Sequence, residues 1–273
     1  MRYVRFRGPS GIETGKVEGG HVVTKGNARI EVLDPETLTL ADPHELLAPI
    51  AAPEVWCTDF TYERTRDARV EESAAQDVYA RAYDAQRPRL FMKDAAGRRT
   101  VGPGQPIGIR DDSNWNVPEP EIGLVLGESG RIAGLTIGND VSSRDIEGAN
   151  PLYLPQAKTY AGACALGPAI YVTENLDATL RIRMRVTDEF GQIVFEDETS
   201  TATMRRSYAE LVEWLLLHNP VPPGSVLLTG TGIVPPDGFS LRAGHFVDIY
   251  VPEIGRLINP VVRASELIQK SAS

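Results

Sequence analysis

The chain has 273 residues, enough for one large domain or two modest ones. Apolar residues make up 42% and charged residues 24%, close to the usual globular mixture, so we expect a packed core rather than disorder. Lysine and arginine number 28 against 37 aspartates and glutamates, and the net charge of −9 argues against nucleic acids and anionic membrane surfaces as partners.

Short strands and turns are predicted for the first fifty residues, at Tyr3–Phe6, His21–Thr24 and Ala28–Val32. A connector rich in alanine and proline follows, from Asp42 to Pro53. We place a domain boundary near residue 50, which gives a small β-rich N-terminal domain (1–50) and a main domain (51–273).

The stretch from Tyr62 to Ala85 contains neither glycine nor proline and predicts a helix that ends before Pro88. A second helix is predicted at Tyr208–His218, stopped by Pro220. The remaining chain has short strand-like runs at Glu121–Leu126, Ile132–Ile137, Ala169–Val172, Leu180–Val186, Gln192–Phe195, Ser225–Thr229 and Phe246–Val251. This pattern predicts an α+β, β-rich fold, and without a GxGxxG or Walker loop it gives no support to a nucleotide cofactor.

The chain shows no apolar run of the about eighteen residues that a membrane helix needs, and its start lacks the apolar segment of a signal peptide. Two cysteines, Cys57 and Cys164, are too few for a disulfide framework or a CxxC zinc site. We therefore expect a cytoplasmic protein.

Acidic residues gather around one predicted hairpin. Glu119 and Glu121 stand two apart at the start of a strand, so they project from one face and repel each other. Asp140 follows the next strand and returns to the same end of the hairpin. Oxygen ligands of this kind suit a hard divalent cation, although a bare pair of glutamates is more often a solvated acidic edge.

Three further features follow this hairpin. Arg144 and Asp145 are adjacent, and an ion pair between them is the simplest interpretation. Lys158 is the only lysine between Lys93 and Lys270; it is either an exposed lysine or a group that binds a carboxylate or carries a proton. A Gly/Thr loop containing Thr231 follows an apolar run and can offer N–H groups to an anion.

Together these motifs resemble the fumarylacetoacetate hydrolase superfamily. The resemblance runs from about Trp56 to the C-terminus, through PEPEIGLVLG, GLTIGNDVSSRDIEG, QAKTYAGACALGP and LLTGTGI. It implies a mixed β-roll catalytic domain, a homodimer, and a pocket lined by Lys158 and Thr231. It also implies a Mg²⁺ or Mn²⁺ ion held by Glu119, Glu121 and Asp140.

The lid departs from the pattern of the superfamily's hydrolases and decarboxylases. Those enzymes carry a histidine three residues after a tyrosine and a glutamate six residues after it, and this pair activates water. Here Thr65 and Ala68 stand at those positions after Tyr62. Because threonine is not a usable base near neutral pH, hydrolysis by this route is not expected.

A narrower resemblance is to the 2-keto-3-deoxy-D-arabinonate dehydratases of pentose catabolism. It rests on the run from Arg144 to Lys158 and on a lid pattern made of Tyr62, Arg64, Thr65, Ala68 and Arg69. It implies a metal-dependent hydro-lyase that forms 2,5-dioxopentanoate through an enolate and β-elimination. The alternatives are a hydrolase, decarboxylase or isomerase of acylpyruvate-type 2-oxo acids, and a metal-binding homologue without catalysis.

Dehydration needs a base and an acid within reach of the substrate. Our candidates are Lys158, near the chelated end of the 2-oxo acid, and Glu147 or a lid glutamate, Glu71 or Glu72, near the leaving hydroxyl. A place on a solvated helix face is the other interpretation of the two lid glutamates. The residues that we expect to contact the substrate are Arg64, Thr65, Arg144, Gln156 and Thr231.

Overall fold

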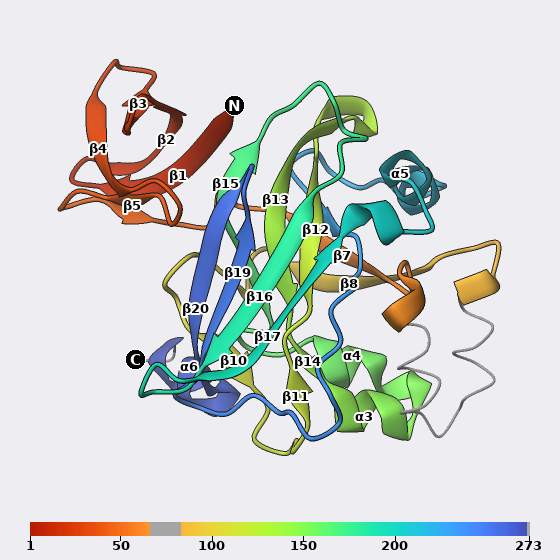
Figure 1. Cartoon of the computed structure of the whole chain (residues 1–273). Coiled ribbons are helices and arrows are strands. Elements are labelled where there is room, and N and C mark those ends of the chain that lie inside the picture. Colours follow the sequence, from red (N-terminus) through yellow and green to blue (C-terminus); the bar gives the residue numbers. More distant parts are fainter. Residues whose placement is uncertain (66–82, 272–273) are drawn as a thin grey trace.

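The computed structural model describes residues 1–65 and 83–271, and within these ranges its strands form three sheets (Figure 1). The largest sheet runs in the order β5 (Thr39–Leu40), β4 (Arg29–Asp34), β3 (His21–Thr24), β2 (Gly11–Glu18), β1 (Arg2–Gly8), β15 (Cys164–Tyr171), β13 (Ile132–Asp140), β12 (Pro120–Leu126), β18 (Val226–Leu228), β7 (Glu54–Asp59) and β8 (Arg89–Ala95). Two short strands extend it, since β6 (Glu45–Leu46) pairs with β1 and β9 (Thr100–Val101) pairs with β15.

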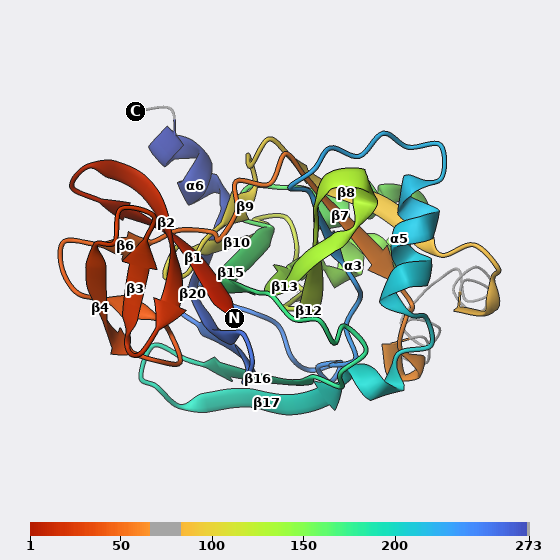
Figure 2. The same cartoon turned by 90° about the horizontal axis from the view of Figure 1, so that it is seen from above.

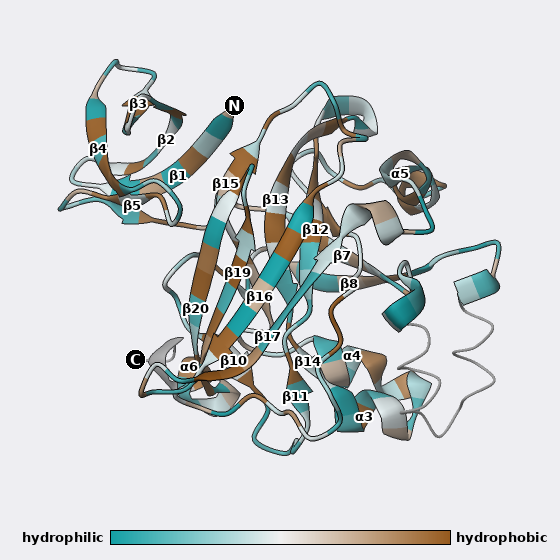
Figure 3. Ribbon diagram, in the orientation of Figure 1, coloured by the Kyte–Doolittle hydropathy of each residue, from teal (hydrophilic) through white to brown (hydrophobic). Residues whose placement is uncertain are grey.

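A second sheet packs across the first and closes the main core. Its order is β10 (Ile107–Ile109), β20 (Gly255–Arg263), β19 (Phe246–Val251), β16 (Arg181–Thr187) and β17 (Ile193–Ser200). Figure 2 shows β16 and β17 as a layer apart from β12 and β13. Ile122 and Ile137 of the first sheet and Met184 and Ile249 of the second belong to one buried cluster. Exposed and buried residues alternate along β16, because only one face of that strand meets the core. Figure 3 shows the matching bands of hydrophilic and hydrophobic residues.

Helices and short turns connect the strands. A small third sheet, β11 (Asn116–Val117) with β14 (Ser142–Ser143), leads into α3 (Arg144–Ala149), η2 (Pro151–Tyr153) and α4 (Leu154–Lys158). The other helical elements are η1 (Glu128–Gly130), η3 (Thr201–Thr203), α5 (Tyr208–Leu216) and α6 (Ala264–Ser271). The Ser207 side chain caps α5 by accepting the Glu210 N–H, and Leu211, Val212 and Leu215 of that helix are buried. No helix in the described ranges has the length and apolar character needed to cross a membrane.

The N-terminal strands have a small core of their own. Val4, Phe6, Val22 and Leu40 belong to a separate buried cluster, to which β15 contributes Ala169. The same strands continue the large sheet, because β1 pairs with the end of β15. The domain boundary near residue 50 stays a prediction.

The predicted long helix is described only at its two ends. Glu63–Thr65 and Tyr83–Asp84 are helical, and residues 66–82 lie outside the described residues. The two candidate lid glutamates, Glu71 and Glu72, fall in that range.

Candidate active site

The hairpin of β12 and β13 brings two of the predicted carboxylates together. Pro120 pairs with Asn139, and the Asp140 N–H donates to the Glu119 carbonyl at 2.9 Å. The Glu119 N–H in turn donates to Asn139 Oδ1 at 3.1 Å. Glu119 and Asp140 therefore leave the same end of the hairpin, as its antiparallel pairing predicts.

A third carboxylate comes from the end of β7. β7 pairs in parallel with β18, which pairs with β12, so Asp59 reaches the same end of the sheet. One oxygen each from Asp59, Glu119 and Asp140 lie within 4.8 Å of one another. Glu119 and Asp140 are 1% and 0% exposed. Carboxylate oxygens converging in a buried position are the ligands that Mg²⁺ and Mn²⁺ prefer.

Glu121 lies beside this group and is fully buried. Its Oε2 accepts the Gly230 N–H at 2.6 Å, while its Oε1 has no hydrogen-bond partner among the described residues. Burial and the charges of Asp140 and Glu119 raise the pKa of Glu121 well above its usual value. A buried carboxylate that is repelled by its neighbours, and has an oxygen without a partner, fits the addition of a cation.

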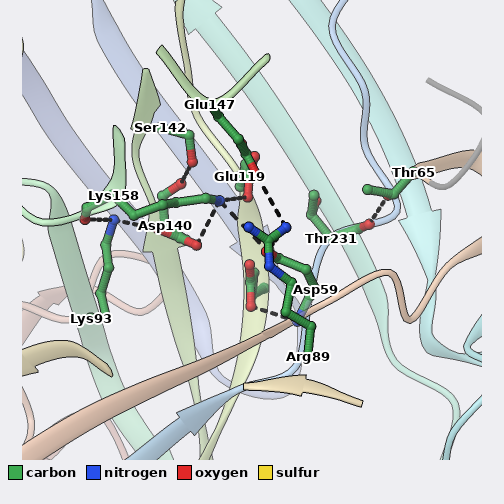
Figure 4. A network of polar contacts seen from close by, with 12 residues as sticks. Asp59, Thr65, Arg89, Lys93, Glu119, Asp140, Ser142, Glu147, Lys158 and Thr231 are labelled. Carbon is green, nitrogen blue, oxygen red and sulfur yellow. Dashed lines mark hydrogen bonds and ion pairs between the residues drawn. The ribbon is translucent and has the colours of Figure 1, made fainter. Parts of the chain in front are cut away.

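Lys158, at the end of α4, supplies positive charge to the carboxylates (Figure 4). Its Nζ lies 2.6 Å from Glu119 Oε2, 2.9 Å from Asp140 Oδ2 and 3.9 Å from Asp59 Oδ1. Burial favours the neutral amine, but Asp140, Glu119, Asp59 and Glu147 raise the pKa of Lys158 well above its usual value. Since its side chain is 0% exposed, the interpretation of Lys158 as an exposed lysine is wrong.

A second buried lysine, Lys93 of β8, contacts Asp140 and the backbone of Lys158. Its Nζ pairs with Asp140, donates to the Val141 carbonyl at 3.0 Å and donates to the Lys158 carbonyl. Burial opposes the ionisation of Asp140, but Lys158 and Lys93 together lower its pKa below the usual value.

The start of α3 directs an arginine into the cluster. Arg144 Nη2 lies 2.8 Å from Glu119 Oε1, and the arginine side chain is 3% exposed. Asp145 instead accepts the Ser113 hydroxyl at 2.6 Å and the Asn114 N–H at 2.8 Å, which fixes the entry to the helix. These contacts take the place of the simple Arg144–Asp145 ion pair that the sequence favoured.

Arg89 links Asp59 to Glu147 at the most exposed point of the cluster. Arg89 Nη1 lies 3.3 Å from Asp59 Oδ2 and 3.4 Å from Glu147 Oε1. Figure 4 shows the guanidinium between these two carboxylates and beside the Lys158 amine. The Glu147 side chain is 1% exposed, and the Arg89 side chain is 20% exposed.

The Gly/Thr loop after β18 faces the site from the other side. Besides the Gly230 N–H that reaches Glu121, the loop is fixed by two threonines of the chain after β7. Thr61 donates its hydroxyl to the Thr229 carbonyl at 2.6 Å, and Thr65 donates its hydroxyl to the Thr231 carbonyl. Thr65 and Thr231 are both buried.

Two predicted substrate contacts lie farther out. Arg64 pairs with Asp197 at 2.7 Å, is about half exposed, and lines a cavity of about 980 Å³ with Tyr62. Gln156 is exposed, and its carbonyl accepts a hydrogen bond from Arg110 at 3.0 Å.

Comparison with protein families gives a match over residues 54–262 to the model described as fumarylacetoacetate (FAA) hydrolase C-terminal. The chain belongs to the fumarylacetoacetate hydrolase family. The family and the β-rich α+β fold expected from the sequence are confirmed.

Individual members of the family are similar over most of the chain. A probable 2-keto-3-deoxyxylonate dehydratase of Haloferax volcanii is 48% identical over 214 residues, 78% of this chain and 73% of that protein. The 2-dehydro-3-deoxy-D-arabinonate dehydratase of Saccharolobus solfataricus is 42% identical over 225 residues, 80% of this chain and 75% of that protein. A solved structure of 2-keto-3-deoxy-D-arabinonate dehydratase complexed with magnesium and 2,5-dioxopentanoate matches 96% of this chain and 99% of its own, with a TM-score of 0.80 and 32% identity.

Three members of the cluster were not predicted from the sequence: Asp59, Arg89 and Lys93. They come from β7 and β8, where no acidic or basic motif marks them. The one available signal was that Asp59 and Lys93 are charged residues within strand-forming runs. Such residues are rarely buried unless they are paired.

Proposed function

We propose that this protein is a magnesium-dependent hydro-lyase that converts 2-keto-3-deoxy-D-arabinonate to 2,5-dioxopentanoate. The observation that carries this proposal is the similarity, over 96% of the chain, to a dehydratase solved with magnesium and that product. Two relatives, 48% and 42% identical, bear the names of dehydratases for the same class of sugar acid.

The metal would be held by Glu119, Glu121 and Asp140. Asp59 adds an oxygen close to those of Glu119 and Asp140. A divalent cation bound there would supply Lewis-acid stabilisation to the negative charge that develops when the C3 proton leaves.

The formal charge of the site supports this assignment. Among the described residues, the cluster sets five carboxylates, of Asp59, Glu119, Glu121, Asp140 and Glu147, against four cationic side chains, of Arg89, Lys93, Arg144 and Lys158. The resulting formal charge of −1 becomes +1 with a divalent ion, which complements the single carboxylate of a 2-oxo acid.

Among the residues that the structure describes, Lys158 and Glu147 are the candidates for proton transfer. The carboxylates around Lys158 keep it protonated, so its ammonium can donate hydrogen bonds to the keto-acid oxygens. Lys158 can act as the base at C3 only after the charge of those carboxylates has been neutralised. Glu147, beside Arg89, is the candidate at the leaving C4 hydroxyl. Glu72 of the lid is the further candidate from the sequence.

Thr65 supports dehydration over hydrolysis. It stands where the hydrolases of the superfamily carry their histidine, and its buried hydroxyl is engaged with the Thr231 carbonyl. Dehydration releases water and needs no group there to activate it.

Of three finer statements, the cytoplasmic location rests on the sequence, and the pathway and the homodimer rest on the family resemblance. We infer that the protein acts in the cytoplasm, in pentose catabolism, and as a homodimer. Sedimentation of the purified protein tests the last of these.

The activity itself is tested by incubating the purified protein and Mg²⁺ with 2-keto-3-deoxy-D-arabinonate and, separately, with an acylpyruvate. Proton NMR identifies 2,5-dioxopentanoate, and EDTA should abolish its formation. Turnover of the acylpyruvate alone would reject dehydration in favour of a hydrolase, decarboxylase or isomerase. Magnesium binding without turnover of either compound would favour the non-catalytic alternative.

A further inference from the structure

Arg89 differs in exposure from the other cations of the cluster. The side chains of Lys93 and Lys158 are 0% exposed and that of Arg144 is 3% exposed, whereas that of Arg89 is 20% exposed. Among the described residues, Arg89 is therefore the most solvent-exposed of the four cations of the cluster.

The ion pairs of Arg89 with Asp59 and Glu147 are longer than those of Lys158 and Arg144 with Glu119. Its Nη1 is 3.3 Å from Asp59 and 3.4 Å from Glu147, while Lys158 and Arg144 lie 2.6 Å and 2.8 Å from Glu119. Well-formed hydrogen bonds between charged groups measure about 2.7–2.9 Å. Arg89 therefore holds Asp59 and Glu147 less tightly than Lys158 and Arg144 hold Glu119.

The fold places this guanidinium at the rim of the carboxylate group. Arg89 begins β8 directly opposite Asp59, the last residue of β7. Its Cζ lies 5.5 Å from the centre of the Phe60 ring, and it reaches across to Glu147 of α3 (Figure 4). A molecule held by its keto-acid end at Glu119 and Asp140 would extend its other end toward this rim.

We propose that Arg89 determines specificity by donating hydrogen bonds to the hydroxyl-bearing end of the substrate. The inference rests on the proposed function, because a 2-keto-3-deoxy-pentonate carries hydroxyls on C4 and C5, beyond the keto acid. A guanidinium is always charged and presents its N–H donors as a rigid fork, which suits two neighbouring hydroxyl oxygens.

The test compares two ligands of equal chain length in the presence of Mg²⁺. One is 2-keto-3-deoxy-D-arabinonate, measured by the KM of its dehydration; the other is 2-oxopentanoate, which lacks both hydroxyls, measured by the Kd from titration calorimetry. The variants are Arg89→Met and Arg89→Lys. Arg87→Met is the matched control, since Arg87 is an exposed arginine two residues away that lies over the Trp214 ring.

We expect Arg89→Met to raise the KM for the hydroxylated acid about 10- to 100-fold, as expected for a lost hydrogen bond to a charged group. The Kd for 2-oxopentanoate should stay within about threefold, because that ligand has no hydroxyl to lose a partner. Arg89→Lys should fall between wild type and Arg89→Met, because an ammonium keeps the charge and lacks the fork. Arg87→Met should match wild type for both ligands.

If Arg89→Met weakens the binding of both ligands equally, the proposal is overturned, since Arg89 would then act by holding Asp59 and Glu147 in place. If Arg87→Met loses as much discrimination between the two ligands as Arg89→Met does, the proposal is also overturned, because the effect would then come from the change in net charge. If Arg89→Met does not fold by circular dichroism, Arg89→Lys alone decides. If the wild-type protein does not dehydrate the sugar acid, the proposed function fails, and the calorimetric Kd values of both acids still test the role of Arg89.

Discussion

Lys93 and Lys158 each contact a different oxygen of the Asp140 carboxylate: Lys93 contacts Oδ1, and Lys158 contacts Oδ2 at 2.9 Å. Lys93 also donates to the carbonyls of Val141 and Lys158. Because an ammonium has three donors, these contacts satisfy Lys93 completely. It is therefore a positioning residue, which fixes both a candidate metal ligand, Asp140, and the backbone of Lys158.

Replacing Lys93 by Met should destabilise the fold by about 3–5 kcal/mol, because Asp140 would keep a buried charge with one partner fewer. Urea denaturation measures the loss, and turnover should fall with it. Lys25→Met, at an exposed lysine, is the control and should change the free energy of unfolding by less than about 0.5 kcal/mol. Equal stability of the two variants would contradict the role of Lys93.

Asp59→Asn tests which carboxylates bind the metal. Asp59 shares the group of close oxygen atoms with Glu119 and Asp140, so its loss should weaken Mg²⁺ binding about tenfold or more in titration calorimetry. Asp84→Asn removes the same charge from an exposed residue that pairs with Arg205, and it should leave the Kd unchanged. An unaltered Kd in Asp59→Asn would exclude Asp59 as a ligand and leave the set predicted from the sequence.

The parts of the site that could be predicted are those that local pattern determines. The hairpin of β12 and β13 follows from two apolar runs and a short turn, and this alone places Glu119 beside Asp140. The burial of Lys158 could not be decided from the sequence, because a single lysine in a polar segment has no periodicity that shows whether its side chain is buried.

Asp59 and Lys93 could not be predicted because their positions depend on long-range pairing. β7 reaches β12 only through β18, where Val55 lies opposite Val226. No local signal specifies a parallel pairing between segments so far apart in the sequence. The partner of Arg144 was missed for the same reason: its neighbour in sequence is Asp145, but its neighbour in space is Glu119.

Gly230→Ala should distort the Gly/Thr loop and disrupt the hydrogen bond from the Gly230 N–H to Glu121. Gly230 has a φ of +85°, and an added Cβ would collide with the Thr61 hydroxyl and lie 3.1 Å from the Thr58 carbonyl. We expect a loss of about 2–4 kcal/mol in the free energy of unfolding, from backbone strain and overpacking. Gly238→Ala is the control, because its added Cβ meets nothing within 4 Å. Similar thermal unfolding of both variants would contradict this account.

Asp145 should contribute stability that depends on pH. Burial raises its pKa, but hydrogen bonds from Ser113, the Asn114 N–H and Ser143 outweigh burial and lower the pKa below the usual value. Because the folded pKa lies below the unfolded value of about 3.9, the ionised carboxylate stabilises the fold above that pH. This stability is lost as the pH falls through the folded pKa.

Asp145→Asn should therefore be less stable than wild type by about 1–2 kcal/mol at pH 7, since the amide replaces a charged acceptor of several hydrogen bonds. Urea denaturation of both proteins at pH 7, 5, 4 and 3 measures the difference, in which the titration of all other groups largely cancels. The difference should stay constant down to about pH 5 and shrink below about pH 4. A difference that grew on acidification would require a folded pKa above the unfolded one, and would show that burial of Asp145 outweighs its hydrogen bonds.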